Sequence, residues 1–327
     1  MKKFVLVVAL IALLSVSVFA NGTAEAGSSA GFKPTKDVEW TCTSKPGGGS
    51  DIFTQQIKEA LKSQGITDAN VVVSYVTDGG GEVGRLQVSM TNKAKADHTL
   101  LTFNSGDIMP MVKNTDNRIE NFTPLAVMAV DKQLLFIGEK SNYKTFQECL
   151  DAIKAGKKVV IAGSKGDDIE TYNKLLAELG LKESQLSYIT NDSTSGAITS
   201  LLGGHVDLCM SKPAAAAQYV EAGKMTAVLA LSKSRFKTPS LKDAPILSEL
   251  GYKDVEVPVW RGVVGPKEMS PEAAEFWSNC LKAVSESEVW QTGYIAKKGL
   301  ISDFKDYKEA KAYMTEYQTN YLKEIGK

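Results

Sequence analysis

From Val38 onward, short apolar segments alternate with stretches in which apolar residues recur at helical spacing. The first cycle comprises VEWTCT, a helix over about 51–64, VVVSYV, a helix over about 82–93, and TLLTF. Buried strands separated by amphipathic helices are typical of a parallel sheet that carries helices on both faces. The pattern therefore predicts a doubly wound α/β unit with right-handed crossovers.

The cycle restarts after Thr123-Pro124 with LAVMAV and LLFIG, and it continues through alternating helices and strands to TAVLALS. We interpret this stretch as a second α/β unit. The strand WRGVVGP at 260–266 follows the completed second unit, so its simplest position is in the first sheet. The chain would then cross twice between two lobes, which makes a hinge beside a cleft.

The sequence thus predicts an α/β protein with two doubly wound domains, joined by two crossover strands around a ligand cleft. We expect the crossings near 121–130 and 225–232. The expected divisions are a signal peptide over 1–20, a tether over 21–36, lobe 1 over 37–124 plus 233–327, and lobe 2 over 125–232.

The N-terminal residues are typical of a signal peptide. Lys2 and Lys3 precede an apolar run over 4–14, and Val18-Phe19-Ala20 has the small-x-small pattern of a cleavage site. The run of about 11 residues is shorter than the roughly 20 that span a bilayer. Because no cysteine follows it, we do not expect a lipoprotein. We expect a periplasmic protein whose Gly- and Ser-rich residues 21–36 form a flexible tether.

The charge balance gives no reason to expect a nucleic acid or an anionic membrane as a partner, because 38 basic residues balance 38 acidic ones. The four cysteines show no CxxC spacing, and neither histidine lies at ligand spacing from them, so we expect no metal and no cofactor. Cys149 could pair with Cys209, and Cys42 with Cys280, but we favour four unpaired thiols.

Glycine-rich or polar loops follow three predicted strands and open the next helices, at 45–51, 104–107 and 163–168. In doubly wound sheets, ligands bind outside the carboxyl ends of strands, where helix N-termini present unpaired N–H groups. Three consecutive glycines in the first loop let a ligand approach the backbone, although a tight turn would also use them. The loop 190–196 offers more hydroxyl and amide donors, but its composition is also common in surface loops.

Residues 79–84, GGGEVG, match the spacing G-x-G-x-x-G of a dinucleotide-binding turn. That motif needs an acidic residue at the end of the following strand, where TLLTF is followed by Asn104. Packing of a helix against a strand therefore explains these glycines better. The phosphate-loop and hydrolase-elbow motifs do not occur in the sequence.

Eight segments in the same order resemble a known family: PGGGSD (46–51), GGGEVG (79–84), ADHTLL (96–101), NFTPLAVMA (121–129), GS-G (163–166), LLGGHVDL (201–208), EAGK (221–224) and WRGVVGP (260–266). Together they are similar to the extracytoplasmic solute receptors of the tripartite tricarboxylate transporters, also called Bug or TctC-like proteins. The resemblance implies a bilobal periplasmic-binding-protein fold and a small carboxylated ligand held largely by backbone amides and water. It also implies delivery of that ligand to the subunits of a membrane permease.

The resemblance places ligand contacts in the three loops, but the chain departs from the family in two places. Asp167 and Asp168 stand where relatives carry serines and glycines, and Arg261 stands where a bulky apolar residue is usual. Two carboxylates facing an anion would repel it. Either they turn outward and cap the helix, which we favour, or the ligand carries a positive group, as an amino acid does. The expected ligand-binding residues are Pro46, Gly47, Gly48, Gly49, Ser50, Asp51, Asn104, Ser105, Gly106, Ser164, Lys165, Gly166, Asp167, Asp168 and Arg261.

The expected function is reversible capture of a small carboxylate by lobe closure, followed by delivery to a permease of the tripartite tricarboxylate type. The ligand would be a di- or tricarboxylate, an acidic amino acid or an aromatic acid, and the protein a monomer without catalytic residues. One alternative is a receptor for a permease of the ABC or TRAP type. A less favoured alternative is an exported enzyme with Asp51, Asp167 or His205 as acid or base.

Overall fold

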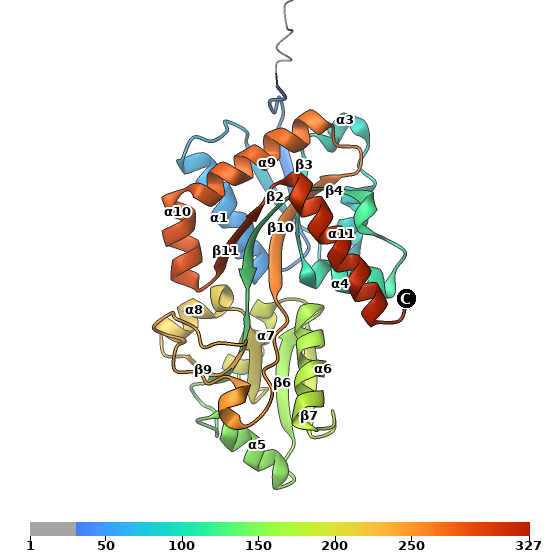
Figure 1. Cartoon of the computed structure of the whole chain (residues 1–327). Coiled ribbons are helices and arrows are strands. Elements are labelled where there is room, and N and C mark those ends of the chain that lie inside the picture. The colour runs from blue at the N-terminus through green and yellow to red at the C-terminus, as the bar shows by residue number, and fades with distance from the viewer. Residues whose placement is uncertain (1–30) are drawn as a thin grey trace, which may run out of the picture. The chain divides into compact units, whose positions relative to one another are not determined.

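Two sheets organise the residues that the computed structural model describes, 31–327 (Figure 1). Within this range, Phe32–Lys327 form one compact unit. The predicted signal peptide and most of the predicted tether lie outside the described residues. None of the helices described in 31–327 is long and apolar enough to cross a membrane.

The first sheet has six strands in the order β11-β4-β10-β3-β1-β2. β1 pairs in parallel with β2 and β3, as the βαβ pattern predicts. β10 pairs antiparallel with β3 and β4, and β11 pairs antiparallel with β4, so the sheet is mixed rather than wholly parallel. The strands are β1 Val38–Cys42, β2 Val71–Tyr75, β3 Thr99–Asn104, β4 Phe122–Asp131, β10 Val259–Pro266 and β11 Ile301–Lys305.

The second sheet has five strands in the order β7-β6-β8-β5-β9. β6 pairs in parallel with β7 and β8, whereas β5 pairs antiparallel with β8 and β9. The strands are β5 Gln133–Gly138, β6 Val159–Ser164, β7 Leu186–Asn191, β8 Leu208–Ser211 and β9 Met225–Leu231.

Two segments of very different length join the sheets. Lys132 alone separates β4 from β5, and the stretch 232–258 leads from β9 back to β10 (Figure 1). β4 pairs with β10 along its length, so LAVMAV is a strand of the first sheet and not the start of lobe 2 at Leu125. The apolar pattern of LAVMAV fits either sheet, and pairing with β10, which lies far along the chain, decides between them.

The return segment also differs from the expected division at residue 233. Ile246 forms a bridge with Ala230 of β9, and Leu247 and Val255 pack in the core of the second sheet. These residues therefore remain with the second sheet after β9 has ended. A loop whose few apolar residues lack a clear period gives no sequence signal for this packing.

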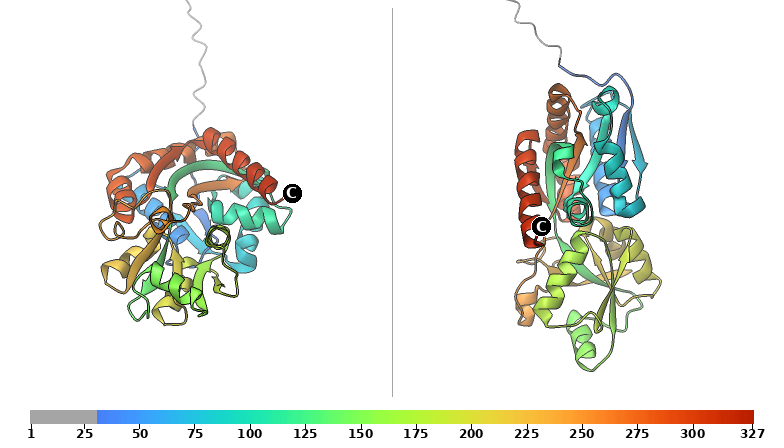
Figure 2. Two further views of the ribbon diagram at one scale, coloured as in Figure 1. Left: turned by 60° about the horizontal axis from the view of Figure 1, so that its bottom comes forward. Right: turned by 90° about the vertical axis from the view of Figure 1, so that its right-hand side faces the viewer.

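Helices cover both faces of the first sheet. Leu100 of β3 packs toward α1 and α9, whereas Leu101 and Phe103 pack toward α4 and α11, as the alternation of side chains along a strand requires. α11 lies beside α4 (Figures 1 and 2). The helices here are α1 Gly49–Ser63, α2 Glu82–Ser89, α3 Lys93–Ala96, α4 Ser105–Asn114, α9 Pro271–Glu286, α10 Glu288–Trp290 and α11 Tyr307–Glu324, with short turns at Asp78–Gly81, Ile119–Asn121 and Gln291–Ala296.

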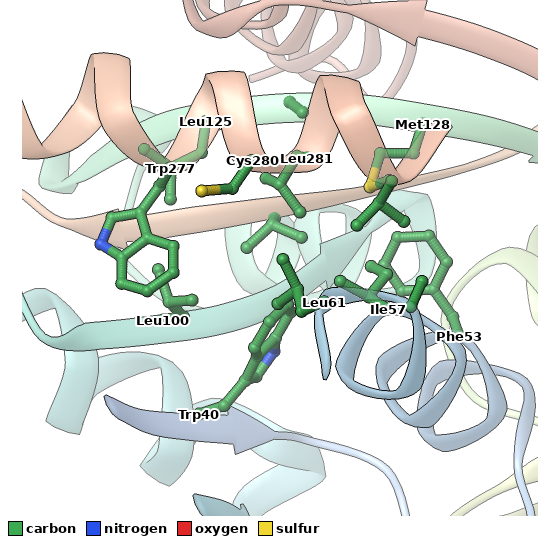
Figure 3. Packing of buried hydrophobic residues seen from close by; sticks show 14 of the residues in the cluster. Trp40, Phe53, Ile57, Leu61, Leu100, Leu125, Met128, Trp277, Cys280 and Leu281 are labelled. Carbon is green, nitrogen blue, oxygen red and sulfur yellow. The ribbon is translucent and has the colours of Figure 1, made fainter. Parts of the chain in front are cut away.

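The largest apolar cluster lies between α1, α9 and the strands of the first sheet. Figure 3 shows Phe53 and Ile57 of α1 facing Leu281 of α9, with Trp277 beside Leu100. Burying four or five large apolar side chains from distant parts of the sequence contributes about 2 kcal/mol for each of them. This cluster therefore fixes the C-terminal helices to the first sheet.

The second sheet is covered in the same way. α5 and α6 pack on one face, and α7 and α8 pack on the other. Their bounds are α5 Phe146–Lys154, α6 Asp167–Leu179, α7 Thr194–Leu202 and α8 Pro213–Glu221, and a short turn spans Leu247–Leu250.

All four cysteines are buried and unpaired. Burial raises the pKa of the Cys42 and Cys149 thiols to about 12. These thiols are therefore protonated at neutral pH and behave as small apolar side chains.

Gly262 lets β10 approach β4 closely. A Cβ at this position would collide with the carbonyl oxygen of Ala126 and lie 3.0 Å from Cε of Met314. The register of β10 against β4 shifts next to this glycine, between Arg261 and Gly262. The glycine thus helps to set where Arg261 emerges from the sheet.

We predict that Gly262→Ala lowers the free energy of unfolding by about 1–3 kcal/mol, because the backbone contact leaves no room for a methyl group. The matched control is Gly293→Ala, since a Cβ at Gly293 meets no heavy atom within 4 Å. Urea unfolding of both variants measures the difference. Equal midpoints for Gly262→Ala and the wild type would contradict the close approach.

Candidate functional site

A polar cavity of about 50 Å³ lies where loops from the two sheets meet. The first sheet contributes residues that follow β1 and end β3, and the second contributes residues that follow or end β6, β7 and β8. This is the edge at which α/β folds bind ligands. The lining residues are Thr43, Ser44, Gly49, Ser50, Asn104, Gly106, Asp107, Ser164, Lys165, Asp167, Asp192, Thr194, Lys212, Val259 and Arg261.

The glycine-rich loop that opens α1 is held by Asp51. The Asp51 carboxylate accepts hydrogen bonds from Gly47 N at 2.7 Å and from the Tyr75 hydroxyl at 2.6 Å, and Asp51 does not line the cavity. Gly47 has a φ of 78°, which favours glycine. Gly49 lies against Arg261, since a Cβ there would be 2.6 Å from Nη2. The glycines therefore let the loop fit closely against its surroundings.

The next loop begins α4 and is fixed by Asn104. Its Oδ1 accepts a hydrogen bond from Gly106 N at 2.8 Å, and its Nδ2 donates to Ser50 Oγ at 3.0 Å. The Asp107 carboxylate in turn accepts from Asn104 N at 3.2 Å, which completes a capping box. The first two loops are thus joined to each other and to the start of a helix.

Arg85 neutralises Asp107 behind this loop. Its Nη1 lies 2.9 Å from Asp107 Oδ1 and its Nε lies 2.8 Å from Glu82 Oε2. The Thr43 hydroxyl donates to Asp107 Oδ1 at 2.6 Å. The turn at 79–84 packs here as expected, since a Cβ at Gly81 would lie 2.8 Å from Cβ of Thr43.

The loop at the start of α6 departs from the expectation. Asp167 and Asp168 do not turn outward, and neither caps α6: they are buried, and the N-cap is Gly166, without a side-chain hydrogen bond. Asp168 Oδ2 instead accepts hydrogen bonds from the amide and the hydroxyl of Ser164, both at 2.7 Å. The reason for the inward turn is Lys212, which directly follows β8, the neighbour of β6.

Lys212 binds both carboxylates. Its Nζ lies 2.6 Å from Asp167 Oδ2 and also contacts Asp168 Oδ1, and Gln133 Nε2 donates to both carboxylates at 2.8 Å. Burial raises the pKa of Asp167 to about 6, although the charge of Lys212 opposes this shift. Burial alone would lower the pKa of Lys212, but the two carboxylates outweigh it and raise that pKa, so the ammonium stays charged.

Arg261 forms a second buried ion pair, with Asp131 at the end of β4. Arg261 Nη2 lies 2.7 Å from Asp131 Oδ2, and both side chains are buried. Burial raises the pKa of the Asp131 carboxyl, and the guanidinium opposes that shift. Because β4 and β10 both lead toward the second sheet, this pair lies at the junction of the two sheets.

Lys165 differs from every other charged residue of the cavity. Its Nζ is buried and has no hydrogen-bond partner among the described residues. Burial lowers the pKa of this ammonium, and the negative charges of Asp107 and Asp192 partly offset that shift. The cavity thus contains one cation without a counter-ion of its own.

The cavity gathers Gly49, Ser50, Asn104, Gly106, Ser164, Lys165, Asp167 and Arg261 from the expected set. It is not lined by Pro46, Gly47, Gly48, Asp51, Ser105, Gly166 and Asp168. Asp107, Asp192 and Thr194 belong to the candidate loops 104–107 and 190–196 but were not among the expected ligand-binding residues. Sequence reasoning missed Thr43, Ser44, Lys212 and Val259. Lys212 could have been found, because it follows a strand that neighbours β6 and so emerges at the same edge.

In the described part of the chain, no group of three or more histidine, cysteine or acidic side chains is arranged to hold a metal ion. Two lobes of α/β structure around a polar cavity, with loops from both, form the periplasmic-binding-protein fold, as predicted. The family description "Tripartite tricarboxylate transporter family receptor" matches residues 42–299. The chain therefore belongs to this family of periplasmic solute-binding receptors, and the resemblance seen in the sequence is confirmed.

Three individual relatives share only a quarter or less of their residues with this chain. A protein of Agrobacterium vitis named "UPF0065 protein in the TAR-I ttuE-ttuC' intergenic region" is 25% identical over 259 residues, 76% of this chain and 71% of its own. The periplasmic binding protein BugD superposes with a TM-score of 0.75 at 21% identity, over 90% of this chain and 98% of its own. MatC from Rhodopseudomonas palustris with bound malate superposes with a TM-score of 0.76 at 17% identity, over 89% and 98%. At such identities the solved structures establish the fold.

We predict that Lys212→Met lowers the free energy of unfolding by about 3–5 kcal/mol, because it leaves two buried carboxylates without their cation. Adding Asp167→Asn and Asp168→Asn to Lys212→Met should restore most of this loss, since the uncompensated charges are then gone. Urea unfolding measures all of these variants. Lys224→Met, which removes an exposed ion pair with Glu139, is the control and should change stability little. A Lys212→Met protein as stable as this control would show that the buried pair is not needed.

Proposed function

We propose that this protein captures a small carboxylate between two lobes and delivers it to a permease of the tripartite tricarboxylate type. The observation that carries the proposal is the buried ammonium of Lys165, which has no partner among the described residues and belongs to a side chain that lines the cavity between the sheets. Leaving a buried cation unpaired is costly. A ligand carboxylate would supply the missing counter-ion.

The surroundings of Lys165 support an anionic ligand that also needs hydrogen bonds. Ser50, Ser164 and Thr194 bring hydroxyl groups to the cavity, and Asn104 brings an amide. The starts of α1, α4 and α6 lie at the same place, and each presents the positive end of a helix. The malate bound to the structural relative MatC agrees with this chemistry, and the family supports a permease partner.

Contacts across the cavity support lobe closure as the means of capture. Lys45 Nζ of the glycine-rich loop lies 2.7 Å from Asp192 Oδ2 of the second-sheet side, and Ser195 Oγ donates to Pro46 O at 3.1 Å. These contacts join the two sides of the cavity, so a ligand would enter when the lobes are apart. Its higher affinity for the closed form then shifts the equilibrium toward closure.

Capture of this kind makes and breaks no covalent bond. The three residues considered as acid or base for an exported enzyme give that alternative no support. The Asp51 carboxylate accepts a hydrogen bond from Gly47 N, and Asp167 is paired with Lys212. His205 is exposed in the turn before β8 and does not line the cavity. The family match also supports the tripartite type of permease over an ABC or TRAP type.

We predict that Lys165→Met weakens binding of the ligand by about 100-fold, because the ligand carboxylate loses its cation. The same change should leave the melting temperature of the unliganded protein unchanged or raise it, since a buried unpaired charge is removed. Calorimetry with succinate, malate, citrate, L-glutamate, L-alanine and benzoate identifies a binding acid, and thermal unfolding provides the second readout.

The control for this variant is Lys224→Met, which removes a lysine from an exposed ion pair outside the cavity. It should bind the same acid as tightly as the wild type does. If Lys165→Met bound that acid with wild-type affinity, Lys165 would not be the counter-ion. If the wild type bound no acid at all, the receptor function itself would be refuted.

A further inference from the structure

Six charged residues line the cavity, and their pairing is uneven. Each of the three carboxylates has a cation: Asp107 lies 2.9 Å from Arg85, Asp167 lies 2.6 Å from Lys212, and Asp192 lies 2.7 Å from Lys45. Arg261 is paired with Asp131 at 2.7 Å. Only Lys165 has no partner of opposite charge among the described residues. The cavity therefore offers one ammonium without an ion pair of its own, which can bind one carboxylate.

A buried cluster of charged side chains beside the cavity carries more negative than positive groups. It contains the three carboxylates Asp131, Asp167 and Asp168 and only two cations, Lys212 and Arg261. With all five groups ionised, the cluster carries one surplus negative charge. The raised pKa of Asp167, about 6, agrees with this surplus, because burial and the neighbouring Asp168 both oppose its ionisation.

Asp167 is the one member of the three carboxylates in this cluster that lines the cavity. The ion pair with Lys212 and the hydrogen bond from Gln133 both reach its Oδ2. Its Oδ1 faces Gly106 at the start of α4, so close that a Cβ on Gly106 would collide with it. A carboxylate of the protein thus lies at the N-terminus of a helix in the first lobe, where the carboxylate of a ligand would otherwise bind.

We infer that the ligand of this receptor is a small zwitterion with one carboxylate and one ammonium group, rather than a di- or tricarboxylate. Lys165 binds the carboxylate, and Asp167 Oδ1 accepts the ammonium. A zwitterion pairs with Lys165 and offsets the surplus negative charge of the cluster, whereas a second ligand carboxylate would meet Asp167 in a buried site and be repelled. This inference rests on the proposed function, since it concerns the chemistry of the captured solute.

Matched pairs of acids test the inference, with an ammonium group in one member replacing a carboxylate in the other. The pairs are glycine and malonate, L-alanine and methylmalonate, and 4-aminobutanoate and glutarate. Calorimetry on the purified wild-type protein should show at least one amino acid binding about tenfold or more tightly than its matched diacid. This comparison needs no variant, so a folding defect cannot obscure it.

Asp167→Asn provides the second arm, because it removes the charge that selects the ammonium group. The preference should move toward the diacid by about tenfold or more. Asp151→Asn, an exposed change on α5 outside the cavity, is the matched control and should keep the wild-type preference. An unchanged preference in Asp167→Asn would overturn the assigned role of Asp167.

The outcomes separate this inference from the proposed function. If a di- or tricarboxylate, or a monocarboxylate without an ammonium group, binds the wild type most tightly, the zwitterion is refuted while carboxylate capture stands. If none of the acids in either panel binds, the proposed function fails and the inference fails with it.

Discussion

The ammonium of Lys212, held between Asp167 and Asp168, is the interaction on which the second-sheet side of the cleft depends. Without a cation at this point, two adjacent carboxylates at the start of α6 could not stay buried. They would turn to solvent, and the Ser164 turn that Asp168 holds would lose its acceptor. The position of Lys165, one residue after Ser164, follows from this arrangement. The ion pairs of Lys212 therefore stabilise the fold and also set the geometry of the site.

Much of the fold was predictable from the sequence because its signals are local. The alternation of apolar strands with amphipathic helices predicted two α/β units, and glycine-rich turns after strands marked the loops that line the cavity. What the sequence could not reveal depends on contacts between distant residues. LAVMAV fits either sheet, and its pairing with the distant strands β10 and β11 settles which one it joins. The inward turn of Asp167 likewise depends on Lys212, 45 positions along the chain by their numbers.

The sequence also could not show what each glycine of the first loop does. A run of three glycines at 47–49 predicted direct contact with a ligand, yet only Gly49 lines the cavity. Gly47 adopts a positive φ and donates its N–H to Asp51, and Gly48 lies against Ser44 and near Ser193. Their small size thus serves the fit of loop against loop. Sequence reasoning pointed to a loop that reaches the cavity, but it could not tell which of its glycines line the cavity and which let the loop pack.

The single residue between β4 and β5 has a mechanical consequence. With Lys132 alone as the connection, the end of one strand and the start of the next cannot move apart, so any relative rotation has its pivot close to this residue. On the return path, Val255 packs with the second sheet and Val257 with the first, so the second crossing lies at Glu256, whose side chain is 3.0 Å from Nζ of Lys132. Displacement then grows with distance from the pivot. The loops farthest from Lys132 would move most, whereas the Arg261–Asp131 pair close to it would hardly move.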